Sequence, residues 1–295
     1  MKNNILNQSI ILKKYIDEKD YAQIYKLEEL CTAQDKVNLK LELDYRLLVH
    51  KDYEKSIKDI NEYFYYIKDD LIGYVGISSF GGNIGEINGM VHPMWRRKGI
   101  FTKLCQLAIE ESRRRDFAKI LVLCDDKSDA AIEFIKSTGA VYSFSEYGMK
   151  RSGSETVDLA NAVVTLKKVT NADAEEIQRQ NSVFFGDAGS EPICPEEEEK
   201  NKKITYMVKI QDKIIGKIKV SREKTTAFIS GFGILPDFRS KGYGKQALKQ
   251  ALSMLNNEGI YEVTLDVVAG NNNALNLYKA CGFKEQSSMN YYEVK

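Results

Sequence analysis

The sequence has few of the residues that bind metals or form disulfides. Its 295 residues include only two histidines and five cysteines, and the cysteines are scattered without a Cys-x-x-Cys motif. Isolated cysteines in odd number, with almost no histidine, argue against a zinc site and against a disulfide framework. We therefore expect no metal cofactor, and thiols that stay reduced in a cytoplasmic protein.

The sequence also lacks an excess of charge and a long apolar run. Lys and Arg number 43 against 42 Asp and Glu, a formal net charge of +1. Proteins dedicated to nucleic acid or anionic membranes usually carry a large basic excess. The N-terminal stretch has no signal-peptide pattern, and no apolar run approaches the ~20 residues of a membrane span. We expect no nucleic-acid or membrane partner, and we interpret the basic run at 113–115 as a solvated helix end.

An internal repeat is present instead. "MVHPMWRRKGIF" at 90–101 is a rougher copy of the segment around "GILPDFRSKGYG" at 233–244, with an offset of 143 residues from Arg96 to Arg239. The same offset aligns five further positions. These pairs are Gly73 with Gly216, Pro93 with Pro236, Gly99 with Gly242, Ala131 with Ala274 and Gly139 with Gly282. The chain is therefore interpreted as a tandem duplication of units of ordinary domain size.

The second copy shows the order of elements more clearly. Alternating residues predict a strand at 163–170, and 171–185 has helical periodicity after an Asn that can cap it. Residues 186–203 hold Gly, Pro and four consecutive glutamates, which predicts a solvated loop. Three strands of an antiparallel meander follow at 204–210, 214–220 and 226–235. Next come a helix at about 240–256, a strand at 261–268, a helix at about 272–280 and the last strands after 282.

The glycine-rich stretch lies between a predicted strand and a predicted helix. Glycines allow positive φ and leave backbone N–H groups uncovered, and such groups at a helix N-terminus suit a phosphate or pyrophosphate. Arg239, Lys241 and Lys245 add positive charge at the rim. A tight turn with a solvated basic helix start is the alternative interpretation. Neither a Walker loop nor a dinucleotide-binding fingerprint matches, because the required glycine pattern or βαβ context is missing.

A second signature follows in "LDVVAGNNNALNLYKACGF" at 265–283, where Asn271 precedes Ala274, Tyr278 and Gly282 at fixed spacing. With Arg239-x-x-Gly242-x-Gly244 upstream, the chain resembles the Gcn5-related N-acetyltransferases, the GNAT superfamily. The resemblance covers about 160–295 well and 61–150 in weaker form. It implies a mixed sheet that opens between its fourth and fifth strands, with acyl-CoA lying in the cleft.

The resemblance also implies which residues bind the coenzyme. The turn and helix start would hold the CoA pyrophosphate, and the backbone at the end of the preceding strand would bind the pantetheine arm and the acetyl carbonyl. The expected cofactor-binding residues are Gly233, Ile234, Leu235, Arg239, Ser240, Lys241, Gly242, Tyr243, Gly244, Lys245 and Asn271.

Transfer of an acetyl group from a thioester to an amine needs a neutral amine, a polarised carbonyl group and stabilisation of the departing thiolate. In the family, the tyrosine that matches Tyr278 commonly donates to the departing CoA sulfur; packing on the helix face is the alternative. Asp266, 12 residues earlier, is a candidate base, because relatives resembling the ribosomal-protein N-acetyltransferases carry a catalytic glutamate in "LEV" where this chain has "LDV". Glu86, in "GEINGMV", is a second acidic candidate. Both carboxylates could equally be ordinary strand side chains.

The two copies are unequal. At the offset of 143, Phe101 stands where the second copy has Gly244, Ile135 where it has Tyr278, and Leu123 where it has Asp266. The first copy thus lacks the phenol and the last glycine of the loop. We therefore expect the acetyl-CoA site in the C-terminal copy, with the N-terminal copy mainly a scaffold.

These observations predict an α+β protein with mixed sheets in two tandem GNAT acyl-CoA N-acyltransferase domains. The expected divisions are 1–150 for a degenerate N-terminal domain, 151–162 for a linker and 163–295 for the acetyl-CoA-binding domain. The predicted function is direct acetyl transfer from acetyl-CoA to a primary amine of a small molecule or peptide, by a monomer or weak homodimer. A non-catalytic acyl-CoA-binding sensor is the alternative.

Overall fold

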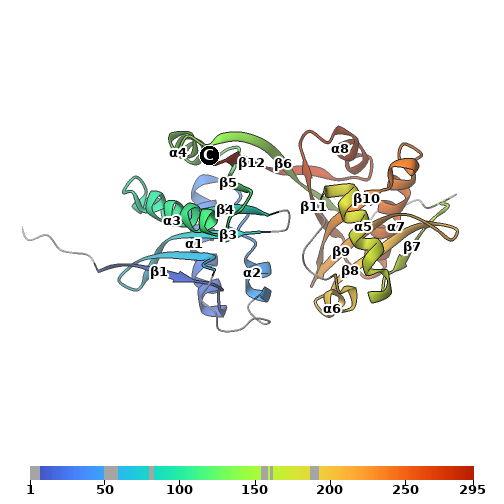
Figure 1. Ribbon diagram of the computed structural model, residues 1–295, viewed down its shortest axis with the longest axis horizontal. Coiled ribbons are helices and arrows are strands. Elements are labelled where there is room, and N and C mark those ends of the chain that lie inside the picture. The colour runs from blue at the N-terminus through green and yellow to red at the C-terminus, as the bar shows by residue number, and fades with distance from the viewer. Residues whose placement is uncertain (1–6, 50–58, 80–82, 154–158, 160–161, 187–192) are drawn as a thin grey trace, which may run out of the picture. The chain divides into compact units, whose positions relative to one another are not determined.

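The chain forms two compact units in a computed structural model, which describes residues 7–49, 59–79, 83–153, 159, 162–186 and 193–295. Unit 1 comprises residues 1–144 and 289–295, and unit 2 comprises residues 145–288. Figure 1 shows the elements of each unit and their labels.

Unit 1 is a mixed sheet with the strand order β1-β2-β3-β4-β5-β12. Its strands are antiparallel except for the parallel pair β4 and β5. The elements are β1 (Gln8–Lys13), α1 (Glu18–Asp35), α2 (Leu43–Val49), β2 (Glu62–Ile67), β3 (Asp70–Ser78), β4 (Ile84–Val91), α3 (Ile100–Arg114), β5 (Lys119–Asp125), α4 (Asp129–Ser137) and the end of β12 (Lys284–Glu293).

Unit 2 repeats this plan with the order β6-β11-β10-β9-β8-β7, in which β10 and β11 form the parallel pair. Its elements are β6 (Val141–Ser152), β7 (Val164–Lys168), α5 (Ala174–Phe185), α6 (Pro195–Lys200), β8 (Lys203–Ile210), β9 (Lys213–Glu223), β10 (Thr226–Ile234), α7 (Tyr243–Asn257), β11 (Glu262–Val268) and α8 (Asn272–Lys279). The predicted α+β fold class, with a mixed sheet in each copy, is confirmed.

The two repeats exchange their last strands. Residues 146–152 of β6, which ends the first repeat, pair with β11 of the second repeat. Residues 289–293 of β12, which ends the second repeat, pair with β5 of the first. The sequence division at 151–162 therefore follows the repeat, whereas each compact unit includes a strand from the other copy. Arg151 and Ser152, predicted as linker, belong to β6, and most of the remaining predicted linker lies outside the described residues.

The glutamate-rich segment corrects one prediction. Residues 195–200 form the short helix α6 rather than a loop, with Pro195 in its first turn and three glutamates at positions 196–198. Proline suits this place because its missing N–H would have no helical partner, and the glutamates complement the positive end of the helix. Two further contacts hold the helix, from Glu198 to Lys219 at 2.6 Å and from Glu199 to Lys168 at 2.7 Å.

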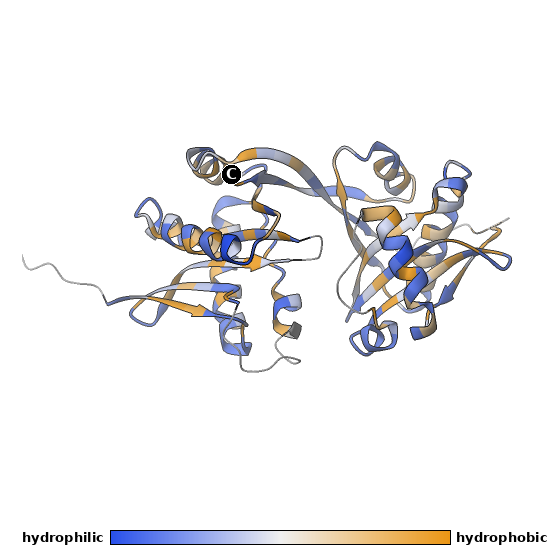
Figure 2. Cartoon of the chain, in the orientation of Figure 1, coloured by the Kyte–Doolittle hydropathy of each residue, from blue (hydrophilic) through white to orange (hydrophobic). Residues whose placement is uncertain are grey.

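Each unit has its own hydrophobic core between its sheet and its helices. In unit 2 the buried face of α7 repeats every three to four residues, with Ala247, Leu248, Ala251, Leu252 and Leu255 against the sheet. Helix α3 occupies the same place in unit 1, and Figure 2 shows both hydrophilic and hydrophobic residues along it. Burying one leucine side chain contributes about 1.5–3 kcal/mol, so these helices are fixed firmly on their sheets. All five cysteines are free thiols.

Candidate functional site

The sheet of unit 2 opens at its parallel strand pair. Strands β10 and β11 pair over only four residues of each strand, from Thr226 with Glu262 to Ile229 with Leu265. Both strands then continue, β10 to Ile234 and β11 to Val268, without pairing to each other. The end of β10 thus presents an edge inside the sheet rather than at its border, as expected from the family resemblance.

A bulge in β10 marks the start of this open edge. The register with β9 shifts between Ser230 and Gly233, and Gly231 adopts a φ of +53°. Leu235 donates its N–H to Ile215 at 2.8 Å, so the polar backbone groups of Leu235 face β9. Because successive backbone groups of a strand point to opposite edges, those of Ile234 face the open side. Of the three predicted backbone contacts, Ile234 is therefore the one oriented toward the opening.

The predicted glycine turn follows directly. A short 3₁₀ helix at Pro236–Phe238 leads to Ser240 and Gly242, whose φ values are +59° and +78°. Gly242 is the N-cap of α7, and no side chain among the described residues caps this helix. The first N–H groups of α7, those of Tyr243, Gly244 and Lys245, have no partner within the helix. Since a Cβ at Gly242 would meet no atom within 4 Å, the turn is open to an anion.

The basic side chains partly build the turn. Arg239 donates Nε to the carbonyl oxygen of Ile234 at 2.8 Å, and Lys241 donates Nζ to that of Asp237 at 2.9 Å. Both side chains and that of Lys245 are exposed. Among the described residues, Arg239 has no carboxylate partner. Its Nη groups can therefore serve a bound phosphate while Nε holds the strand end in place.

Gly244 allows α7 to lie close to α8, and it does not adopt a positive φ. A Cβ at this position would lie 2.9 Å from Cδ1 of Leu277 in α8 and 3.6 Å from Cγ1 of Ile234. The first contact is tighter than van der Waals packing allows. Glycine therefore lets the start of α7 lie against α8 beside the open strand edge.

Tyr278 and Asn271 belong to α8. Asn271 is the N-cap, and its Oδ1 accepts the N–H of Ala274 at 3.1 Å, so its direct role in the structure is to begin this helix. Tyr278 is buried to 8% exposure and its ring meets Phe283 edge-on, with centroids 6.0 Å apart. Burial raises the pKa of Tyr278 to about 12, so its hydroxyl remains a donor at physiological pH.

Asp266 lies on β11 just beyond the last residue that pairs with β10. Its neighbours Leu265 and Val267 belong to the core beneath α7. Because side chains alternate along a strand, Asp266 projects from the opposite face, where it is exposed. The carboxylate thus stands at the opening, on the side of the sheet away from α7.

The sequence interpretation missed Lys217 on β9. It was placed in a predicted strand without being assigned a role, and the structure shows that Lys217 is only 2% exposed. It is the register partner of Gly233, so it lies beside the bulge of β10. Helix α5 contributes to this burial, because its Phe184 and Phe185 rings lie near the ammonium group. The predicted helix at 171–185 was the one sequence signal that a helix could cover the face of β9 on which Lys217 lies.

Unit 1 has the same opening and the same turn. Strands β4 and β5 pair only from Ile84 with Lys119 to Ile87 with Val122. Arg97 and Gly99 have φ values of +62° and +73°, close to those of Ser240 and Gly242. Loop shape alone therefore does not distinguish the two units.

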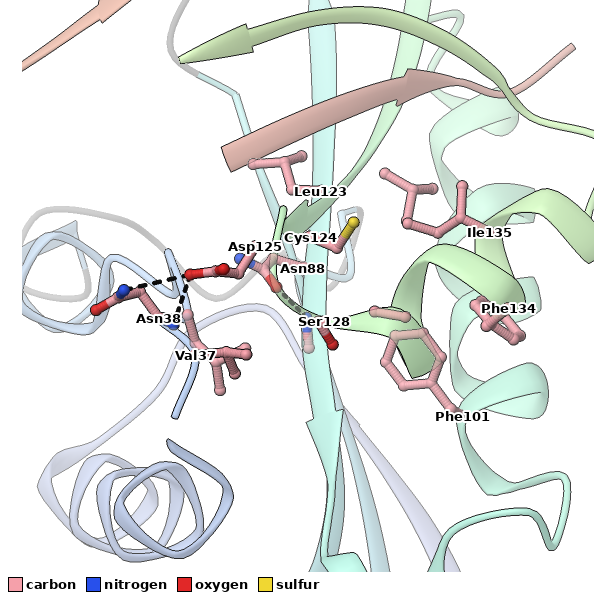
Figure 3. Close-up of a pocket in the computed structure, with 14 residues that line it drawn as sticks. Val37, Asn38, Asn88, Phe101, Leu123, Cys124, Asp125, Ser128, Phe134 and Ile135 are labelled. Atoms are coloured by element: carbon pink, nitrogen blue, oxygen red, sulfur yellow. Dashed lines mark hydrogen bonds between the residues drawn. The ribbon is translucent and has the colours of Figure 1, made fainter. Parts of the chain in front are cut away.

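The residues just beyond the turn differ between the units. Phe101 packs edge-on against Phe134 with centroids 4.9 Å apart, where unit 2 has Gly244 and Leu277. Figure 3 shows these rings at one side of a cavity and Asn38 hydrogen-bonded to Asp125 at the other. Asn38 donates from its backbone at 2.8 Å and from its side chain at 3.2 Å. The cavity measures about 40 Å³, which holds no more than a few water molecules.

Glu86, the second acidic candidate, lies on β4 of unit 1 and is the register partner of Leu121. It is within the paired part of β4, before the strands separate, whereas Asp266 and Tyr278 are both in unit 2. The structure therefore groups two of the three predicted catalytic residues in one unit.

The described part of the chain holds no group of three or more His, Cys, Asp or Glu side chains placed to bind a metal ion. Nor does that part contain a helix with the length and apolar character needed to cross a membrane.

A sheet that opens beside an uncapped glycine turn is the architecture expected of an acyl-CoA N-acyltransferase. The chain belongs to the Acetyltransferase (GNAT) family, whose sequence profile matches residues 22–140 and 172–283, more than half of its length. The two matched segments correspond to the two repeats, so the tandem arrangement is confirmed. The family uses acetyl-CoA.

Individual relatives agree with this assignment. The chain is 42% identical over 59 residues to the uncharacterized N-acetyltransferase YycN of Bacillus subtilis (strain 168), a match covering 20% of this chain and 38% of that protein. The fold is similar to a GCN5-related N-acetyltransferase from Sphaerobacter thermophilus, with 16% identity, a TM-score of 0.76 and coverage of 97% and 96% of the two chains. It is also similar to a tandem GNAT protein from the clavulanic acid biosynthesis pathway, with 14% identity, a TM-score of 0.68 and coverage of 98% and 99%.

Proposed function

We propose that the protein is an N-acetyltransferase that moves the acetyl group of acetyl-CoA directly to a primary amine, with the chemistry in unit 2. The observation that carries this proposal is the continuity from the open end of β10, through the uncapped turn at Gly242, to the start of α7. Backbone donors along this path match a ligand with a carbonyl at one end and a pyrophosphate at the other.

In this proposal the turn binds the pyrophosphate. The N–H groups of Tyr243, Gly244 and Lys245 face the anion, and the positive end of the α7 dipole favours its charge. Arg239 and Lys241 add positive charge around the turn. The N–H of Ile234, on the open edge of β10, donates to the acetyl carbonyl and polarises it.

Tyr278 assists the departing sulfur. Acetyl-CoA supplies an activated acetyl thioester, and its thiol has an ordinary pKa near 8.5. The Tyr278 hydroxyl, with a pKa of about 12, is therefore roughly 3.5 units weaker as an acid, about 5 kcal/mol uphill for complete proton transfer. Tyr278 acts by hydrogen bonding to the thiolate rather than by giving up its proton.

Asp266 is proposed as the base for the incoming amine. An alkylamine with a pKa near 10.4 is almost entirely protonated at pH 7, so removal of a proton precedes attack. Asp266 stands on the sheet face away from α7, which leaves that face to the acceptor. Aspartate is one methylene shorter than the glutamate of the relatives, and a water molecule can bridge the difference.

Unit 1 is proposed to serve as a scaffold. Its turn is preserved, but the packed rings of Phe101 and Phe134 stand where unit 2 has Gly244 and Leu277. We therefore expect one acetyl-CoA per chain.

Calorimetric titration of acetyl-CoA into the full chain tests binding, and release of free CoA in the presence of an amine panel tests transfer. One bound molecule and amine-dependent release are expected. Absence of binding would exclude the proposal, and binding without release for any amine would favour the non-catalytic sensor.

A further inference from the structure

Lys217 is a buried amine that the proposed mechanism does not use. It lies in the middle of β9, with Met207 of β8 and Gly233 of β10 as its register partners. By strand alternation Lys217 shares the sheet face that carries Asp266, opposite α7. Helix α5 covers it there, which explains its exposure of 2%.

The ammonium group of Lys217 is bound to a backbone carbonyl group and lies near an aromatic ring. Its Nζ donates to the carbonyl oxygen of Gly231 at 3.0 Å and lies 5.3 Å from the ring centroid of Phe185. Among the described residues no acidic side chain is paired with it. Lys219, two residues further along the strand, instead forms an ion pair with Glu198 at 2.6 Å.

This environment leaves more of the Lys217 amine neutral than is usual for a lysine. Its pKa is lowered to about 8, chiefly by burial and also by the nearby charge of Lys219, against the opposing influence of Glu198. At pH 7 about one molecule in ten therefore has the neutral amine, compared with fewer than about one in a thousand for an ordinary lysine. Losing the proton breaks no ion pair with any of the described residues.

The position of Lys217 supplies the second requirement, proximity. Gly231, whose carbonyl accepts the Nζ hydrogen bond, lies in the bulge that begins the open edge of β10. Ile234, three residues further along β10, is where we place the acetyl carbonyl. An amine held beside a thioester needs little reorganisation to attack it.

We propose that Lys217 is itself an acetyl acceptor, so that the protein acetylates its own chain at this residue. The inference rests on the proposed function, since acetyl-CoA bound in unit 2 is the donor. The nitrogen lone pair of neutral Lys217 attacks the acetyl carbon, a C–N bond forms and the thioester C–S bond breaks. The proton lost by the nitrogen finishes on the released CoA thiol, so the step balances without any further reactant.

The product suits the site. An acetylated Lys217 is neutral, which removes a charge that is costly to bury. Its amide N–H can still donate to Gly231, and its methyl group adds apolar surface next to Phe184 and Phe185. The modification would change the charge on the face assigned to the acceptor.

The test incubates the full chain with acetyl-CoA and locates added acetyl groups by intact mass and peptide mapping. We expect one acetyl group at Lys217, formed at least about tenfold faster than at Lys219, the matched lysine on the same strand and face. Because the reacting form is the neutral amine, the rate should rise up to about pH 8 and then level off, whereas acetylation of ordinary lysines continues to rise. The variant K217R should lose the modification, and K219R should keep it.

Acetyl-CoA binding is measured in parallel by calorimetry. Binding without acetylation of Lys217, or acetylation spread evenly over exposed lysines, would overturn this inference and leave the proposed function intact. Absence of binding would remove the donor and exclude both proposals. The variant G244E separates catalysed from chemical acetylation, because modification of Lys217 should disappear when the turn cannot hold the coenzyme.

Discussion

Arg96 and Arg239 make the same hydrogen bond in the two units. Each donates Nε to the carbonyl oxygen of the residue five positions earlier, Arg96 to Val91 at 3.0 Å and Arg239 to Ile234 at 2.8 Å. The arginine of the repeated motif thus ties the end of the open strand to the turn beyond it. In unit 1 the same guanidinium also forms a bidentate pair with Asp35, at 2.7 and 2.8 Å. Its anion-binding atoms are occupied there, which agrees with a coenzyme site in unit 2.

The first prediction concerns the glycine turn. Gly244→Glu should lower the affinity for acetyl-CoA by at least about 100-fold, because a carboxylate would face the pyrophosphate and the side chain would collide with Leu277. Calorimetry measures the affinity.

The control variant is Gly99→Glu in the turn of unit 1, at the position that corresponds to Gly242, and it should leave the affinity for acetyl-CoA unchanged. Its positive φ makes it cost about 1–2 kcal/mol of stability, so thermal unfolding is recorded for both variants. Equal losses of affinity from the two substitutions would contradict the asymmetry between the units.

The second prediction concerns Tyr278→Phe. Removing the hydroxyl should lower kcat about tenfold, the worth of one hydrogen bond to a charged group, and change the acetyl-CoA dissociation constant by less than about twofold. Since the pKa of Tyr278 is about 12, its deprotonation should cause no fall in wild-type rate below about pH 11. Steady-state kinetics across pH checks both points. A variant as fast as the wild type would assign Tyr278 to packing alone.

The third prediction concerns the base. Asp266→Asn should lower kcat about 100-fold at pH 7, with a smaller loss at higher pH, where more of the acceptor amine is neutral. Asp266→Glu is the matched control: it keeps the carboxylate and has the length found in relatives, so it should retain activity. If Asp266→Asn is fully active while Glu86→Gln is not, the base has been assigned to the wrong carboxylate.

The fourth prediction concerns Lys217 and stability. Its pKa is lowered from 10.5 to about 8 in the folded state. Below about pH 8, Lys217 is protonated in both the folded and the unfolded protein, and burial of the charged ammonium group destabilises the folded protein. Between about pH 8 and pH 10.5 only the unfolded state keeps the proton, so stability should rise with pH, by about 3 kcal/mol in total.

Lys217→Met removes this cost. The variant should be more stable than the wild type below about pH 8, with the difference shrinking as pH approaches 10.5. Lys219→Met, which loses the ion pair with Glu198, should instead be less stable by up to about 1 kcal/mol. Denaturant unfolding at several pH values measures both, and a pH-independent difference for Lys217→Met would contradict the buried-charge account.

Some parts of this protein could be predicted from local sequence patterns. The meander of β8, β9 and β10, helices α7 and α8, and the positive φ at Gly242 were all predicted, because alternation, helical periodicity and the freedom of glycine act over a few residues. The helix α6 was missed, since four glutamates after a proline suit a helix start as well as they suit a loop.

Other parts depended on contacts between distant residues. The pairing of β6 with β11 and of β12 with β5 joins strands that are more than 100 residues apart in the sequence. A local sequence pattern can identify a strand, but it does not identify the strand with which it pairs. The burial of Lys217 depends on α5, which crosses a face that looks polar from β9 alone.

The sequence alone therefore established the duplication, the order of elements, the turn that can hold an anion and the inequality of the two copies, because each is encoded by residue type at short spacing. Only the tertiary structure decided which strands complete each sheet, that Phe101 packs against Phe134 in unit 1, and that Lys217 loses contact with water. Those outcomes depend on how side chains from separate elements share space, which single-residue preferences do not specify.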